Sequence, residues 1–113
     1  MNRWLVNRVV QSPNCNERAL PVSMVVLHYT GMRSSGGGRA RLCDPAPQVS
    51  AHYLIDEDGA VTNLVPEEKR AWHAGKSYWR GITDVNSASI GIELVNPGHE
   101  FGYRPFPEPQ MDA

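Results

Sequence analysis

The four histidines of this chain are the residues most able to bind a metal ion. His28, His52, His73 and His99 are many for a sequence of 113 residues, and neutral imidazole is the usual nitrogen ligand of zinc. No Cys-x-x-Cys or His-Glu-x-x-His spacing accompanies them in the sequence. The residue types alone therefore leave a structural role and a metal-binding role open for each histidine.

Glu93 is the candidate general acid or base. Polar or small side chains alternate strictly with apolar ones from Ser89 to Leu94, which predicts a β-strand with two different faces. Glu93 shares its face with Ser89 and Gly91, so its carboxylate projects either into solvent or into a cleft beside small residues. Next to a zinc ion, this carboxylate could accept a proton from water and pass it to a leaving amine.

Aromatic and basic side chains are concentrated in the stretch that follows residue 71. Flat aromatic side chains pack against sugar or peptide faces, and arginine binds carboxylates. The cluster predicts either the rim of a site for a polar ligand or ordinary half-buried packing. The side chains concerned are Trp72, His73, Tyr78, Trp79 and Arg80, joined by the more distant Tyr103.

A few predicted strands must position these residues. The run 22–29 is rich in β-branched and apolar residues and predicts a central strand buried on both faces, with His28 near its carboxyl end. The runs 51–56 and 60–65 flank an Asp-Gly turn, a pair that supplies the backbone conformation a chain reversal needs. These two runs therefore predict a β-hairpin.

Helices contribute little to the predicted fold. Residues 39–43 predict one or two helical turns, ended by the prolines that follow. Residues 66–77 have no clear period and predict an edge strand or a loop. Because no amphipathic helix of ten or more residues occurs, we expect one face of the sheet to be left bare.

Length and composition limit the class of protein. A chain of 113 residues predicts a single small domain. Its formal charge of −1 offers no basic field for nucleic acid, and no run approaches the roughly 18 apolar residues of a membrane span. No secretory signal is recognised, so we expect a cytoplasmic protein whose two cysteines, Cys15 and Cys43, are free thiols.

Four segments, in this order, resemble the zinc-dependent N-acetylmuramoyl-L-alanine amidases, which share their fold with the peptidoglycan recognition proteins. The resemblance runs from Ser12 to the end of the chain. It implies an α/β fold with a mixed central β-sheet, and it implies peptidoglycan or a muropeptide as the substrate. The segments are Val26–Met32, Val49–Asp56, Arg70–Gly75 and Ser89–Gly98.

The resemblance also implies a reaction and the residues that perform it. The family hydrolyses the amide between the lactyl group of N-acetylmuramic acid and L-alanine, with Zn²⁺ as Lewis acid and source of hydroxide. By the motif match, His28 is the first zinc ligand and Glu93 is the catalytic carboxylate. We expect His73, together with Trp72 and Tyr29, to contact the substrate. We expect His52 to be a structural residue or one that supports the site residues from behind.

The sequence departs from the family pattern near its end. The family takes two further zinc ligands, a histidine and an aspartate, from a region that follows a long helix, and this sequence stops before both. Gly98-His99-Glu100 only superficially resembles the missing histidine segment, and we do not expect His99 to be a ligand. Residues 1–113 are thus expected to form one incomplete amidase domain, lacking the C-terminal helix and ligand segment, with weak metal binding. The alternatives are a non-catalytic module that binds muramyl peptides and an inactive truncated fragment.

Overall fold

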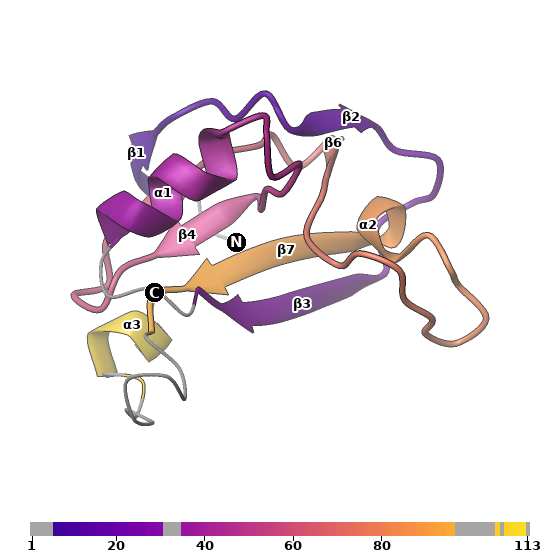
Figure 1. Cartoon of the computed structure of the whole chain (residues 1–113). Helices are drawn as coiled ribbons and strands as arrows, with labels where there is room; N and C mark the ends of the chain where they lie inside the picture. Colours follow the sequence, from indigo (N-terminus) through magenta and orange to yellow (C-terminus); the bar gives the residue numbers. More distant parts are fainter. Residues whose placement is uncertain (1–5, 31–34, 97–105, 107, 113) are drawn as a thin grey trace.

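A five-stranded mixed sheet forms the centre of the part of the chain that the structure describes. The structure is a computed structural model and describes residues 6–30, 35–96, 106 and 108–112. The strand order is β1-β5-β4-β7-β3, and only the β4–β5 pair is antiparallel. This arrangement confirms the predicted α/β fold with a mixed central sheet (Figure 1). The strands are β1 Val6–Val9, β3 Met24–Tyr29, β4 Tyr53–Ile55, β5 Val61–Asn63 and β7 Ser89–Leu94.

The predicted hairpin is confirmed by the pairing of β4 with β5. Tyr53 pairs with Asn63 and Ile55 with Val61. Gly59 in the connecting turn has a φ of 90°, a backbone conformation that L side chains rarely adopt. The Asp-Gly turn therefore sets the register of both strands.

The prediction for 22–29 was wrong about burial. Among the strands that the structure describes, β3 lies at the edge of the sheet with β7 as its neighbour. Its alternate side chains Val25, Leu27 and Tyr29 are 60%, 62% and 49% exposed. An unbroken apolar run does not distinguish a strand covered on two faces from one covered on a single face, so the sequence pattern could not place β3 at the edge.

Two apolar clusters lie on opposite faces of the main sheet. One forms beneath helix α1 (Ser35–Cys43) and contains Leu42 and Leu54; α1 lies across β4 in Figure 1. The predicted turns at 39–43 are the second half of this helix. The other cluster lies on the opposite face of the sheet, which we call the apolar face. Its buried members are Tyr53, Ile55, Val61, Ile90, Ile92 and Leu94.

Smaller elements complete the described part of the chain. Strands β2 (Cys15–Glu17) and β6 (Lys69–Ala71) pair as an antiparallel ribbon, so part of the segment 66–77 is an edge strand, as predicted. Cys15 and Cys43 are free. Helix α2 (Val85–Ala88) leads directly into β7, and helix α3 (Glu108–Asp112) binds the sheet through the side chain of Gln110.

Within the described ranges, no helix has both the length and the apolar composition that a membrane span requires.

Candidate functional site

His28 and Glu93 lie on the same face of the sheet as direct neighbours. Parallel strands β3 and β7 pair His28 with Glu93, and paired positions on neighbouring strands are roughly 4.8 Å apart and point to the same side. The same face carries Ser89 and Gly91. We call it the site face, and the structure brings together on it the imidazole and the carboxylate singled out in the sequence.

Glu93 is a half-buried carboxylate at the wall of a cavity. Burial raises its pKa from 4.5 to about 7, although the charge of Arg41 acts in the opposite direction. Oε2 of Glu93 is buried and has no hydrogen-bond partner within the described residues. The cavity measures about 210 Å³, and Arg41, Thr30 and His73 also line it. Such a carboxyl group can both accept and release a proton near neutral pH.

His73 bonds both to His28 of β3 and to Ser89 of β7. Its Nδ1 lies 3.0 Å from Nε2 of His28, and its Nε2 lies 2.9 Å from Oγ of Ser89. Burial, followed by the proximity of His28, lowers the pKa of His73 to about 3, and burial also lowers the pKa of His28. Both imidazoles are therefore neutral at physiological pH, the form in which imidazole binds a metal.

Both ring nitrogens of His52 form hydrogen bonds with main-chain groups. His52 is fully buried, its Nδ1 accepts the N–H of Gly91 at 3.0 Å, and its Nε2 donates to the carbonyl oxygen of Lys69 at 2.8 Å. Burial lowers the pKa of His52, the bond to Lys69 acts against this, and the charge of Arg18 adds to the lowering. These contacts tie His52 to the main chain of β7 and of β6.

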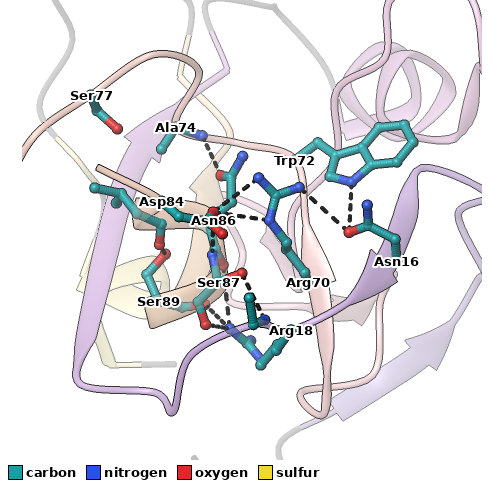
Figure 2. Close-up of polar contacts among 12 residues, drawn as sticks. Asn16, Arg18, Arg70, Trp72, Ala74, Ser77, Asp84, Asn86, Ser87 and Ser89 are labelled. Atoms are coloured by element: carbon teal, nitrogen blue, oxygen red, sulfur yellow. Dashed lines mark hydrogen bonds and ion pairs between the residues drawn. The ribbon is translucent and has the colours of Figure 1, made fainter. Parts of the chain in front are cut away.

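Polar contacts hold helix α2 at both of its ends, as Figure 2 shows. Asp84 caps the amino end of α2 by accepting the N–H of Ser87, and it binds Arg70 as an ion pair at 2.9 Å. At the other end, Nη1 of Arg18 donates to the carbonyl oxygens of Asn86, Ser87 and Ser89 at 3.3, 2.6 and 2.9 Å. A helix of four residues is unstable alone, so these contacts hold it in place.

Two of the predicted substrate-contacting residues lie apart from the cavity. Tyr29 is paired with Leu94 of the apolar face, so its half-exposed side chain lies on the opposite side of the sheet from His28. The indole of Trp72 donates to Oδ1 of Asn16 at 3.2 Å (Figure 2). His73 alone of the predicted substrate residues lines the cavity.

Sequence reasoning missed the residues that support the histidines. Asn86 and Arg18 gave no signal, because their contacts join segments far apart in the chain. Ser89 and Gly91 were noticed as small residues beside Glu93, and the alternation of this strand was the only signal that could have found them. Gly91 is required for space, since a Cβ there would lie 2.5 Å from Cδ2 of His73.

The donors in the described residues fit part of a zinc site. Neutral His28 and the unpartnered Oε2 of Glu93 are the chemistry such a site needs. A catalytic zinc takes three protein ligands, and no group of three His, Cys, Asp or Glu side chains able to hold a metal occurs among residues the structure describes. His99 lies outside those residues.

Comparison with known proteins decides the family. Residues 18–113 match the family Amidase_2, described as N-acetylmuramoyl-L-alanine amidase. The chain belongs to this amidase family.

Individual amidases are similar over most of this chain. It is 38% identical to the N-acetylmuramoyl-L-alanine amidase AmiD of Escherichia coli, over 81% of this chain and 37% of AmiD. It is 36% identical to the 1,6-anhydro-N-acetylmuramyl-L-alanine amidase AmpD of Haemophilus influenzae, over 77% of this chain and 58% of AmpD. The structure of E. coli AmiD with anhydro-N-acetylmuramic acid-L-Ala-D-gamma-Glu-L-Lys superposes with a TM-score of 0.74 at 38% identity, over 87% of this chain and 42% of that one. The chain thus spans between about a third and three fifths of the length of these curated relatives.

Proposed function

We propose that the protein hydrolyses the amide bond between N-acetylmuramic acid and L-alanine. The observation that carries this proposal is the pairing of His28 with Glu93 on the site face, with a buried carboxylate oxygen that lacks a partner. In a chain of the amidase family, these are groups suited to activating water. We further propose that residues 1–113 belong to a single amidase domain, located in the cytoplasm.

Glu93 is the proton carrier in the proposed reaction. A water molecule attacks the carbonyl carbon of the lactyl amide and gives up a proton to the Glu93 carboxylate. When the C–N bond breaks, Glu93 returns that proton to the nitrogen of L-alanine. The products are the muramoyl carboxylic acid and a peptide with a free amino terminus. A carboxyl with a pKa of about 7 is suited to both transfers.

His28 is the residue of the described chain that would hold Zn²⁺. When bound, the ion polarises the scissile carbonyl and lowers the pKa of water, which makes water a nucleophile near neutral pH. His28 contributes a neutral imidazole, and its burial keeps it neutral. In this proposal Glu93 stays free of the metal so that it can exchange protons.

A muropeptide is the proposed substrate. The related AmiD structure contains an anhydromuramyl peptide, and the related AmpD is named for the 1,6-anhydro sugar. His73 lines the cavity beside Glu93 and is proposed to approach the substrate there. The substrate contacts of Trp72 and Tyr29 remain predictions. Both side chains lie outside the cavity, which argues against these contacts.

Chelation tests the proposed function directly. The protein is incubated with an anhydromuramyl tripeptide, and release of the free peptide is followed by mass spectrometry. We expect cleavage that a chelator abolishes and that added Zn²⁺, but not Mg²⁺, restores. Cleavage that resists the chelator would contradict the role of zinc, and absence of cleavage with Zn²⁺ present would contradict the hydrolase.

A non-catalytic muramyl-peptide binder is the second candidate. The presence of a single expected zinc ligand, His28, among the described residues favours it. Calorimetric titration with the same tripeptide separates the two functions. A binder holds the tripeptide in the presence of chelator and leaves it intact with Zn²⁺ present, whereas an enzyme converts it.

A further inference from the structure

The hydroxyl of Ser89 is held in one orientation by the main chain of α2. Ser89 is fully buried, and its Oγ lies 2.7 Å from the carbonyl oxygen of Val85. A carbonyl oxygen cannot donate, so the hydroxyl proton points at Val85. Oγ therefore presents lone pairs to Nε2 of His73, 2.9 Å away, and accepts a hydrogen bond from that ring N–H.

The orientation of Ser89 fixes the tautomers of two histidines in turn. A neutral imidazole has one N–H and one lone pair, and since Nε2 of His73 donates to Ser89, Nδ1 of His73 carries the lone pair. That Nδ1 lies 3.0 Å from Nε2 of His28, so Nε2 of His28 is the donor. The proton of His28 is thereby placed on Nε2, and Nδ1 of His28 keeps its lone pair.

The ring of His73 is also fixed through its main chain. Oδ1 of Asn86 accepts the N–H groups of His73 and Ala74 at 3.0 and 2.8 Å. The missing Cβ of Gly91 leaves room for the ring, and the ring centroids of His28 and His73 are 5.2 Å apart. His73 therefore has little freedom to turn away and release His28.

We propose that Ser89 is a positioning residue, which acts through His73 to hold His28 as the Nε2–H tautomer and to leave Nδ1 as its metal-binding nitrogen. Histidine ligands in proteins are commonly oriented by a partner that binds the second ring nitrogen, and here that partner is a histidine fixed by a serine. The proposal rests on the proposed function, because it assigns the atom of His28 that would bind Zn²⁺.

NMR of the ring nitrogens in the metal-free protein tests the tautomer. In the wild type we expect the His28 proton on Nε2 and a lone pair on Nδ1. In Ser89→Ala we expect His28 to become a mixture of both tautomers, and in Ser89→Thr, which keeps the hydroxyl, we expect the wild-type tautomer. Ser77→Ala is the matched control, since Ser77 is a half-buried serine whose hydroxyl donates to the carbonyl oxygen of Gly75 and contacts no histidine among the bonds described.

Competition with a chromophoric chelator then measures the affinity for Zn²⁺ itself. Loss of a group that orients a metal ligand lowers metal affinity by roughly 10- to 100-fold. We expect a loss of this size in Ser89→Ala, and affinities near the wild-type value in Ser89→Thr and Ser77→Ala. Circular dichroism establishes that each variant is folded before its affinity is compared.

The outcomes separate this proposal from the proposed function. A wild-type His28 with its proton on Nδ1 would overturn the role of Ser89, whatever the variants do and whether or not the protein cleaves muropeptides. A folded Ser89→Ala variant with unchanged tautomer and unchanged Zn²⁺ affinity would overturn it as well. The expected tautomers and affinities in a protein that binds Zn²⁺ without cleaving muropeptides would support the role of Ser89 while the hydrolase fails.

Discussion

Strand β7 presents two different surfaces to its surroundings. On the site face it carries Ser89, Gly91 and Glu93, whose contacts are with histidines and with a cavity. On the apolar face it carries Ile90 and Ile92, which are each 7% exposed and pack in one cluster. A single alternating strand thus divides its residues between chemistry and packing, so substitutions on the two faces are expected to change different measurable quantities.

Removing the carboxylate should have the largest effect, a loss of activity without a loss of stability. We expect Glu93→Gln to lower the rate of muropeptide cleavage by about 10²- to 10⁴-fold, the usual contribution of a general acid–base group. The unfolding free energy should stay the same or rise, because a neutral amide is less costly to bury than a carboxylate. Steady-state kinetics and urea unfolding measure the two quantities. Glu68→Gln, at an exposed position, is the control. If Glu93→Gln cleaves the muropeptide at the wild-type rate, Glu93 has no part in the chemistry.

Truncating a side chain on the apolar face should reverse this pattern. We expect Ile92→Ala to lower the free energy of unfolding by about 2 to 5 kcal/mol, because a buried side chain is replaced by a cavity. The cleavage rate per folded molecule should remain within about twofold of the wild type, since Ile92 points away from the site face. Urea unfolding combined with activity below the transition tests this. A large loss of rate at unchanged stability would show that the two faces are not separable.

The pH dependence of stability provides a third test, because burying the ionised carboxylate of Glu93 costs free energy. Its pKa is raised from 4.5 to about 7 in the folded protein, so the folded state binds the proton more tightly than the unfolded state does. The contribution of Glu93 to stability is therefore greatest below about 4.5 and is lost as the pH rises to about 7. The slope is at most about 1.4 kcal/mol per pH unit. Urea unfolding of the metal-free wild type across this range should show the decline, and Glu93→Gln should flatten it.

Gly91 is a position on the site face where one substitution should change both stability and activity. We expect Gly91→Ala to lower the unfolding free energy by about 1 to 3 kcal/mol, the usual cost of overpacking, because the new Cβ meets the ring of His73 at 2.5 Å. It should also lower activity, since His73 must move. Thermal unfolding and kinetics measure both. An Ala variant that is as stable and as active as the wild type would mean that the His73 ring can shift freely.

The smallest effect is expected where the apolar side of the sheet is open. Leu27 is the register partner of Ile92 but is 62% exposed. We expect Leu27→Ala to cost at most about 1 kcal/mol of unfolding free energy, because little apolar area leaves contact. Measured beside Ile92→Ala, it compares burial at paired positions of one sheet. A cost equal to that of Ile92→Ala would indicate that Leu27 is covered in solution.

The local parts of this structure could be predicted from the sequence. The alternation from Ser89 to Leu94 gives both faces of β7, because side chains in a strand point to opposite sides in turn. The Asp-Gly pair gives the hairpin, because the turn needs a residue that tolerates positive φ. Both signals act between neighbours in the chain, so no knowledge of the remaining fold is needed.

The long-range parts could not be predicted from pattern alone. The register of His28 with Glu93 joins strands 65 positions apart, and nothing in either strand specifies that pairing. The edge position of β3 depends on which strand lacks a second neighbour. The supporting contacts of Ser89 and Asn86 depend on where the ring of His73 lies. The family resemblance supplied the candidate residues, and the structure supplied their arrangement.

The hydrogen bonds from Arg18 to the carbonyl end of α2 have a consequence for the order in which the molecule folds. The guanidinium binds carbonyl groups 68 to 71 positions later in the chain, so a very long loop must close before this contact exists. Because α2 is too short to persist without it, its amides should exchange with solvent only in openings that also separate the strands. The histidine arrangement would then be among the last features to assemble and would be lost in the same cooperative step as the sheet.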